Sequence, residues 1–317
     1  MKKMEVDGCP VIGKGVFGTV YRIEDDKIVK VANDIKRKGT RERLEYEDKV
    51  ARVLYESGIP TAQSFGLVEV GDSVGVIYEM IEGMELYDYL EKYPDRAEQM
   101  IRAVSDILLK LHKTKPTEDG LLKMKDKLTG LLIAGKKALS EEEFAAKMKV
   151  YEALPERDTL VHGDLNPGNI IVRPDDSPVL IDVGSISIGH PYFEFTNMQQ
   201  PIMMLTEVAY GWEELVAHMM KTLRIADRDS FLRQTELLKD FYEKLFRQYF
   251  RDLEAGERDT VIGNLKKKAF SKAVTFYERL PLPDEEKKRE TVLQLKKENE
   301  KKQLEVGPID AWWPAGY

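Results

Sequence analysis

Alternating apolar and polar positions predict a β-rich segment at the start of the chain. Residues 10–32 alternate in the manner of strands and are interrupted by glycines, with Asp25 and Asp26 where a hairpin would turn. Two further apolar runs, 63–70 and 74–81, are separated by the turn-forming letters GDS. We therefore expect a small antiparallel sheet in this part of the chain.

A single helix is predicted between these strands. In residues 41–57 the apolar positions follow helical spacing, namely Leu44, Val50, Val53 and Leu54. Gly58 and Pro60 then end the periodic pattern, as residues that break helices do. The first part of the chain thus reads as a β-rich lobe with one helix.

The rest of the chain is predicted to be mainly helical. Residues 97–112 form an amphipathic pattern, and two lysine-rich helical stretches lie between 113 and 155. Ser140 and Glu143 have the spacing of a capping box at the start of the second stretch.

Later segments continue the helical pattern after one interruption. Two short apolar strands, 170–173 and 179–182, interrupt it, and a helical pattern resumes from 194 to about 280. Residues 284–303 are mostly charged, which is typical of a solvated helix or tail.

These patterns together predict an α+β protein with two lobes. We expect a β-rich lobe at 1–81, a larger helical lobe at 82–283, and a charged tail at 284–317 that carries the pair Trp312 and Trp313.

Composition narrows the class of protein. The chain has 317 residues, of which 42% are hydrophobic and 33% are charged, and it has one cysteine. We find no apolar run of membrane-spanning length and no signal peptide, so we expect a cytoplasmic protein without membrane association. The net charge of −7 disfavours nucleic-acid binding and is compatible with a cationic substrate. Nothing in the sequence indicates an oligomeric state.

A glycine triplet and a lysine suggest a phosphate site in the first lobe. Gly13, Gly15 and Gly18 have the spacing G-x-G-x-x-G, which lets backbone N–H groups approach phosphates closely. Strand-like residues follow the triplet, which disfavours a Rossmann fingerprint, and an ordinary glycine-rich hairpin is the alternative. Lys30 alternates with Val29 and Val31, so this lysine needs a carboxylate partner or a phosphate.

The segment "VHGDLNPGNII" at 161–171 carries a second group of polar residues. Pro167 and Gly168 exclude a regular helix here. The segment matches H-x-D-L-x-x-x-N, and "LIDVG" places Asp182 thirteen residues after Asn169. Asn169 and Asp182 offer the oxygen ligands that Mg²⁺ prefers, and Asp164 is left to accept a hydroxyl proton.

These motifs resemble those of the protein-kinase-like superfamily, and more narrowly of its aminoglycoside phosphotransferase and choline kinase branch. The resemblance runs from about Ile12 to Thr196 and implies a two-lobed protein-kinase-like fold. It further implies ATP as the phosphoryl donor, with GTP as a second candidate, together with Mg²⁺ and a hydroxyl-bearing small molecule as acceptor.

The resemblance also implies roles for individual residues. Lys30 would hold the α- and β-phosphates and be oriented by Glu47, preferred to Glu45 because Glu47 shares an inward face with Val50 and Leu54. The adenine contacts would be Val20 and Ile28 above the ring, Ile171 below it, and the Glu79 carbonyl and Ile81 N–H at its edge. Glu194 stands where the family has an aspartate that braces the catalytic loop. Further acidic candidates for binding a cationic substrate are Glu207, Glu213 and Glu214.

Two departures separate the chain from protein kinases. Gly163 and Asn166 replace the arginine and lysine that are usual there, and only eleven residues separate Asp182 from Glu194, with no A-P-E afterwards. A small-molecule kinase is therefore preferred. A Ser/Thr protein kinase and a nucleotide-binding scaffold without transfer activity stay as alternatives, although Lys30, Asp164, Asn169 and Asp182 are all present, which argues against the scaffold.

Overall fold

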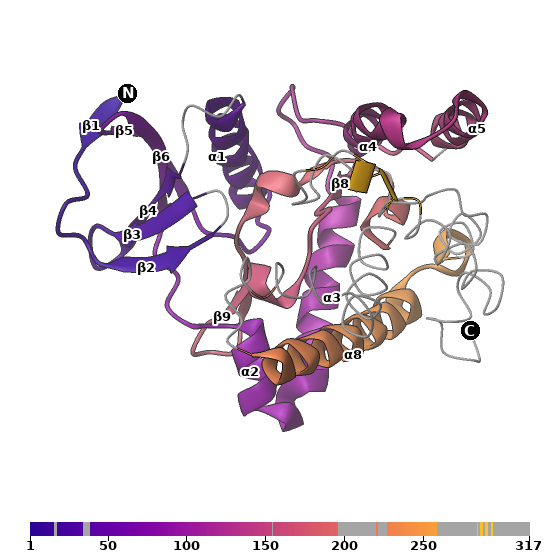
Figure 1. The fold of residues 1–317 in the computed structure, drawn as a ribbon. Helices are drawn as coiled ribbons and strands as arrows, with labels where there is room; N and C mark the ends of the chain where they lie inside the picture. The colour runs from indigo at the N-terminus through magenta and orange to yellow at the C-terminus, as the bar shows by residue number, and fades with distance from the viewer. Residues whose placement is uncertain are drawn as a thin grey trace. The chain divides into compact units, whose positions relative to one another are not determined.

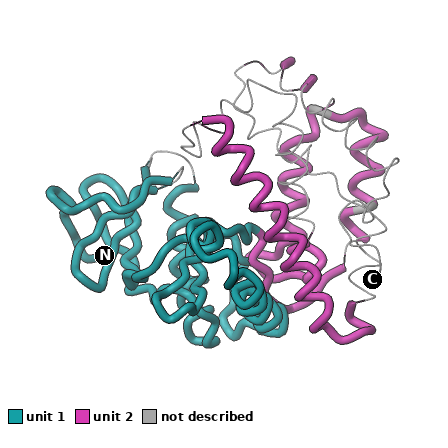
Figure 2. The backbone as a smooth tube through the Cα atoms, turned by 90° about the horizontal axis from the view of Figure 1, so that it is seen from below, with its two compact units in different colours: residues 1–121, 164–186 teal, residues 122–163, 187–317 magenta. Residues whose placement is uncertain are grey.

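The computed structural model of the chain forms two compact units (Figure 2). Unit 1 consists of residues 1–121 and 164–186, and unit 2 of residues 122–163 and 187–317. The described residues are 1–15, 18–33, 39–153, 155–195, 220, 227–258, 284, 286–287, 289–290 and 293. The lobe boundary expected near residue 81 stays a prediction.

A six-stranded sheet forms the first part of unit 1 (Figure 1). Its strands are β1 (Lys2–Met4), β2 (Val11–Lys14), β3 (Gly18–Arg22), β4 (Lys27–Ala32), β5 (Ser64–Val70) and β6 (Ser73–Glu79). They lie in the order β1-β5-β6-β4-β3-β2. All neighbours pair antiparallel except β1 and β5, which pair in parallel. Strand β1, whose parallel pairing adds to the predicted antiparallel sheet, was not predicted, because three residues are too few to show a period.

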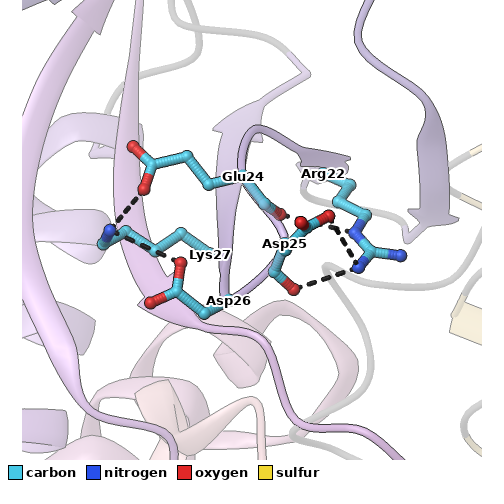
Figure 3. Close-up of polar contacts among 5 residues, drawn as sticks. All are labelled: Arg22, Glu24, Asp25, Asp26 and Lys27. Carbon is cyan, nitrogen blue, oxygen red and sulfur yellow. Dashed lines mark hydrogen bonds and ion pairs between the residues drawn. The ribbon is translucent and has the colours of Figure 1, made fainter.

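The turn between β3 and β4 lies where Asp25 and Asp26 predicted it (Figure 3). The Arg22 guanidinium donates to the Asp25 carbonyl oxygen at 3.0 Å and approaches its carboxylate at 3.5 Å. On the other side of the turn, the Lys27 ammonium group pairs with the Glu24 carboxylate, and Lys27 Nζ lies 3.5 Å from Asp26 Oδ1. Side chains of both strands thus close the turn, and β4 enters the sheet with Lys30 in a defined register.

The two faces of the sheet carry different side chains. Helix α1 (Thr40–Glu56) packs on one face against β5 and β6, with its apolar positions buried as the helical period predicted. A cluster of Val29, Val31, Val68 and Val70 forms a separate apolar core. Because side chains alternate along β4, Lys30 and Ile28 point away from that cluster.

The second part of unit 1 joins a short sheet to helices. Its elements are β7 (Met84–Glu85), α2 (Leu86–Lys92), η1 (Pro94–Arg96), α3 (Ala97–Lys113), η3 (Pro167–Asn169), β9 (Ile170–Val172), β10 (Pro178–Leu180) and η4 (Val183–Ser185). Strands β9 and β10 form an antiparallel hairpin, and β9 pairs also with β7. The predicted strand at 179–182 ends two residues early, because the backbone turns at Asp182.

Unit 2 is mainly helical. Its described elements are α4 (Met124–Ala134), η2 (Gly135–Ala138), α5 (Glu141–Glu152), β8 (Leu160–Val161), β11 (Ser187–Ile188) and α8 (Arg228–Asp252). The capping box predicted from Ser140 and Glu143 is present at the start of α5. Phe195 packs against three aromatic rings of α8, namely Phe246, Tyr249 and Phe250.

Helix α8 confirms part of the helical pattern predicted between 194 and 280. The other candidates in this part of the chain, Glu207, Glu213 and Glu214, lie outside the described residues, as do Trp312 and Trp313 and most of the predicted charged tail. Among the described helices, none is both long and apolar enough to cross a membrane.

Candidate active site

Lys30 lies on β4 between two buried neighbours, and its own side chain is only 16% exposed. Strand β3 runs beside it with Gly18 opposite Ala32. A Cβ atom on Gly18 would lie 3.0 Å from the Val31 carbonyl oxygen and 3.2 Å from Lys30 Cγ, so glycine permits this close approach. The backbone of the glycine-rich strand therefore lies directly against the lysine.

The Lys30 ammonium group contacts two carboxylates. Nζ lies 2.7 Å from Glu47 Oε1 and 2.7 Å from Asp182 Oδ1. Burial is the largest single influence and lowers the pKa of Lys30, but the charges and hydrogen bonds of the two acids outweigh it. The pKa therefore lies above its ordinary value, and Lys30 is a cation at neutral pH.

Glu47 supplies the buried partner of Lys30. Its side chain is only 5% exposed, whereas Glu45 is exposed and pairs with Arg41 on the same helix. The Tyr78 hydroxyl donates to Glu47 Oε1 at 3.2 Å. Burial and the Glu47 charge raise the pKa of Tyr78 well above its ordinary value, so this tyrosine stays a neutral donor. The predicted pairing of Lys30 with Glu47 is thus present, and the role of Glu47 in catalysis stays a prediction.

Asp182 follows the β9–β10 hairpin in an unusual backbone conformation. Its φ of 52° and ψ of 50° are left-handed, which is uncommon for a residue other than glycine. The hairpin brings the residue before Asp182 next to Asn169 in space, because the Ile181 N–H donates to the Asn169 carbonyl oxygen at 2.9 Å. The side chain of Asp182 is 52% exposed, so it can reach solvent or a ligand as well as Lys30.

The loop that carries Asp164 is held by its own amides. Asn166 and Asn169 each donate from Nδ2 to the Asp164 carbonyl oxygen, at 3.1 Å and 2.9 Å. Asn166 Oδ1 in turn accepts from the Gly168 N–H at 2.9 Å, which forms the cap of η3. The Asn166 amide, at the position where protein kinases have a lysine, therefore shapes the loop.

Glu194 braces the residues just before Asp164. Its carboxylate is fully buried and accepts from the backbone N–H groups of His162 and Gly163, the second at 3.1 Å. Gly163 adopts a φ of 76°, where glycine is favoured. A longer glutamate thus reaches the backbone at the position where the resemblance implied an aspartate.

The glycine-rich turn has a side-chain support that sequence reasoning missed. The Gly15 N–H donates to the Gly18 carbonyl oxygen at 2.8 Å, and Gly13 pairs with Val20 across β2 and β3. Asn33 donates to the Gly15 carbonyl oxygen at 2.9 Å and accepts from the Thr19 hydroxyl at 2.8 Å. The sequence signal that could have indicated this contact is a polar residue, Asn33, directly after the apolar strand β4.

The predicted adenine contacts all lie in unit 1, and their role stays a prediction. Val20, Ile28 and Ile171 are half-buried apolar side chains on three strands, and Ile81 is buried. The Glu79 side chain pairs with Arg173 at 2.9 Å, which links the end of β6 to the end of β9.

The residues proposed to bind Mg²⁺ fit that ion chemically. Asn169 donates through its nitrogen, which leaves the amide oxygen as the acceptor end, and Asp182 supplies a carboxylate. The described residues hold no cluster of three or more acidic, histidine or cysteine ligands. A site with two protein oxygens suits Mg²⁺, because this ion usually takes its other ligands from phosphates and water.

Comparisons with known proteins identify a family and a shared fold. The profile of a phosphotransferase enzyme family matches residues 9–232. The gentamicin complex of APH(2")-IIa aligns over 91% of this chain and 92% of its own, with 18% identity and a TM-score of 0.55. The aminoglycoside phosphotransferase APH(3")-Id from Streptomyces rimosus, in complex with ADP and streptomycin, aligns over 81% and 93%, with 17% identity and a TM-score of 0.45. Among curated proteins, none matches the sequence.

The APH(2")-IIa structure shares the fold, and the family profile covers well over half of the chain. The chain therefore belongs to the phosphotransferase enzyme family.

Proposed function

We propose that this protein transfers the γ-phosphoryl group of ATP to a hydroxyl group of a small molecule. The observation that carries the proposal is the double ion pair of Lys30 with Glu47 and Asp182, both at 2.7 Å. Asp182 is 152 residues from Lys30 along the chain, and the fold brings the two together in unit 1. Membership of the phosphotransferase family supports the same reaction.

The nucleotide would be held by the sheet and the β9–β10 hairpin. Lys30 binds the α- and β-phosphates and is oriented by Glu47, whose burial keeps the ion pair strong. The glycine turn offers backbone N–H groups to the phosphates. The adenine would contact the half-buried Val20, Ile28 and Ile171, with the Glu79 carbonyl and Ile81 N–H at its edge.

Asn169 and Asp182 would hold Mg²⁺. When bound, the ion neutralises charge on the β- and γ-phosphate oxygens. The short β9–β10 hairpin keeps the chain segments that carry these two residues side by side, because the Ile181 N–H donates to the Asn169 carbonyl oxygen.

Asp164 would accept the proton of the attacking hydroxyl group. The transition state of phosphoryl transfer is loose, so the carboxylate needs to orient the hydroxyl more than to act as a strong base. Precise orientation requires a rigid loop, which the amides of Asn166 and Asn169 and the carboxylate of Glu194 provide.

The acceptor is proposed to be an aminoglycoside, an amino alcohol or a sugar. The net charge of −7 favours a cationic compound among these. Gentamicin, which is bound in the APH(2")-IIa complex, is a suitable first compound to test. A cytoplasmic location belongs to the same proposal.

A transfer assay tests the proposal. Wild type and Asp182→Asn are incubated with ATP or GTP, Mg²⁺ and a panel of hydroxyl compounds, and phosphorylated products are detected by mass spectrometry. We expect one small molecule to gain a phosphate group with wild type and much less with the variant. Phosphorylation of a Ser/Thr peptide alone would indicate a protein kinase, and nucleotide binding without transfer to any acceptor would indicate a scaffold.

A further inference from the structure

Besides Glu47, a second residue of helix α1 contacts the segment that follows β10. The Tyr46 hydroxyl donates to the carbonyl oxygen of Ile186 at 2.7 Å, across 140 residues of sequence. Tyr46 is half-buried and directly precedes Glu47, and Ile186 is fully buried. One helix therefore holds a carboxylate partner of Lys30 and a carbonyl group near Asp182.

Helix α1 supports the segment from Asp182 to Ile186 at three points, the first of them through Lys30 on β4. At its first residue, Asp182 shares the Lys30 ammonium group with Glu47. In its middle, a Cβ atom on Gly184 would lie only 3.3 Å from Glu47 Oε2, so this backbone lies directly against the glutamate. At its last residue, the Ile186 carbonyl oxygen accepts a hydrogen bond from the Tyr46 hydroxyl group. The Ile186 N–H also donates to the Val183 carbonyl oxygen at 3.0 Å.

Such support is needed because Asp182 is in a strained conformation. The left-handed backbone is unfavourable for a residue with a side chain and persists where surrounding contacts impose it. The ion pair with Lys30 alone does not impose it, because a half-exposed carboxylate can exchange its partner for water or a phosphate-bound cation. The Tyr46 contact is made to the backbone and is independent of that exchange.

We infer that Tyr46 is a positioning residue whose hydroxyl group, by holding the Ile186 carbonyl, keeps the segment 182–186 in the conformation that presents Asp182 to Mg²⁺. The inference rests on the proposed function. Tyr46 itself would touch neither the nucleotide nor the metal, and it acts through the backbone that carries the ligand.

The variant Tyr46→Phe removes one hydroxyl group and leaves the ring in place. Tyr55→Phe is the matched control, because Tyr55 lies on the same helix and is 48% exposed. Calorimetry measures the affinity for ADP alone and for ADP with Mg²⁺, for wild type and both variants. The gain in affinity that Mg²⁺ brings is the quantity compared, since it depends on the metal ligands and not on the adenine contacts.

We expect Tyr46→Phe to reduce this Mg²⁺-dependent gain about tenfold, the effect of losing one hydrogen bond that orders a ligand. The affinity of Tyr46→Phe for ADP alone should stay at the wild-type value. Tyr55→Phe should keep both wild-type affinities, with and without Mg²⁺. A lower melting temperature with an unchanged Mg²⁺-dependent gain would show a structural role only and overturn the inference. A wild type that binds ADP with no gain from Mg²⁺ would overturn the proposed function itself, which separates the two failures.

Hydrogen exchange of the wild-type protein without nucleotide gives a second measurement, which holds even where Tyr46→Phe does not fold. Slow exchange of the peptide covering 182–188 agrees with a segment that is already held by α1. Exchange as fast as in an exposed loop would contradict the inference.

Discussion

Two buried glutamates support the proposed reaction in different ways. Glu47 in unit 1 faces a side-chain cation, Lys30, and a tyrosine hydroxyl group. Glu194 in unit 2 faces two backbone N–H groups, those of His162 and Gly163. Both carboxylates are buried, but the partners of one can change position and the partners of the other are fixed in the chain.

The difference agrees with what each region would do in phosphoryl transfer. A lysine that binds phosphates must be able to share its charge between protein carboxylates and an incoming nucleotide, and a side chain can do this. A loop that orients a hydroxyl group must keep one geometry, and a carboxylate bound to backbone amides restricts the chain directly. Four substitutions test this difference between the two glutamates, beginning with the one that has the largest expected effect.

Asp164→Ala tests whether the loop braced by Glu194 carries the reacting group. We expect turnover to fall about 10²- to 10⁴-fold with nucleotide affinity retained, because the carboxylate orients the acceptor hydroxyl and takes its proton. Steady-state kinetics with the acceptor found in the screen measure the effect, and the exposed Asp158→Ala is the control. Turnover near the wild-type value would remove Asp164 from the mechanism.

Glu194→Ala tests the fixed partner. It removes the carboxylate that accepts from the buried His162 N–H and the half-buried Gly163 N–H, so we expect the free energy of unfolding to fall by about 2–4 kcal/mol. Glu194→Gln keeps one acceptor oxygen and is expected to lose less. Chemical denaturation provides the measurement, and equal stability of the alanine variant and wild type would show that the loop does not need this brace.

Glu47→Gln tests the movable partner. Among the described residues, Lys30 then keeps Asp182 as its acidic partner, so we expect kcat/KM for ATP to fall about 10- to 100-fold, the equivalent of about 1.5–3 kcal/mol. The control is Glu45→Gln, two residues earlier on the same helix, where the glutamate is exposed and pairs with Arg41. Equal losses in both variants would contradict a special role for Glu47.

Tyr78→Phe has the smallest expected effect and appears at high pH. The pKa of Tyr78 is raised in the folded protein, so its contribution to stability is complete below the unfolded value near 10 and is lost as the pH rises toward the folded value. The phenylalanine variant cannot ionise and should therefore unfold at a higher pH in an alkaline titration followed by circular dichroism. Identical alkaline midpoints would mean that Tyr78 ionisation does not limit stability.

Local patterns were sufficient for much of this fold. The helical period predicted α1 and α3 to within a residue or two, and the spacing of Ser140 and Glu143 predicted the cap of α5. Each of these features depends on residues close together in the sequence, where periodicity and capping chemistry apply.

Contacts between distant residues were predictable only in part. The ion pair of Lys30 with Glu47 followed from strand alternation, a helix face and the motif resemblance, whereas the direct contact of Lys30 with Asp182 was not predicted, because Asp182 was assigned only as a metal ligand. The contacts of Tyr46, Tyr78 and Asn33 were missed, because no sequence pattern names the hydrogen-bond partner of a side chain that reaches another element. The parallel pairing of β1 was missed because this strand is too short to show a period.

The left-handed backbone of Asp182 has a consequence for protein engineering. Glycine adopts this conformation freely, so Asp182→Gly would relieve about 1–2 kcal/mol of local strain. A library selected for heat resistance alone would therefore be drawn toward a substitution that deletes the proposed metal ligand. Directed evolution of this protein should couple each stability screen to an activity screen, since durability and turnover oppose each other at this position.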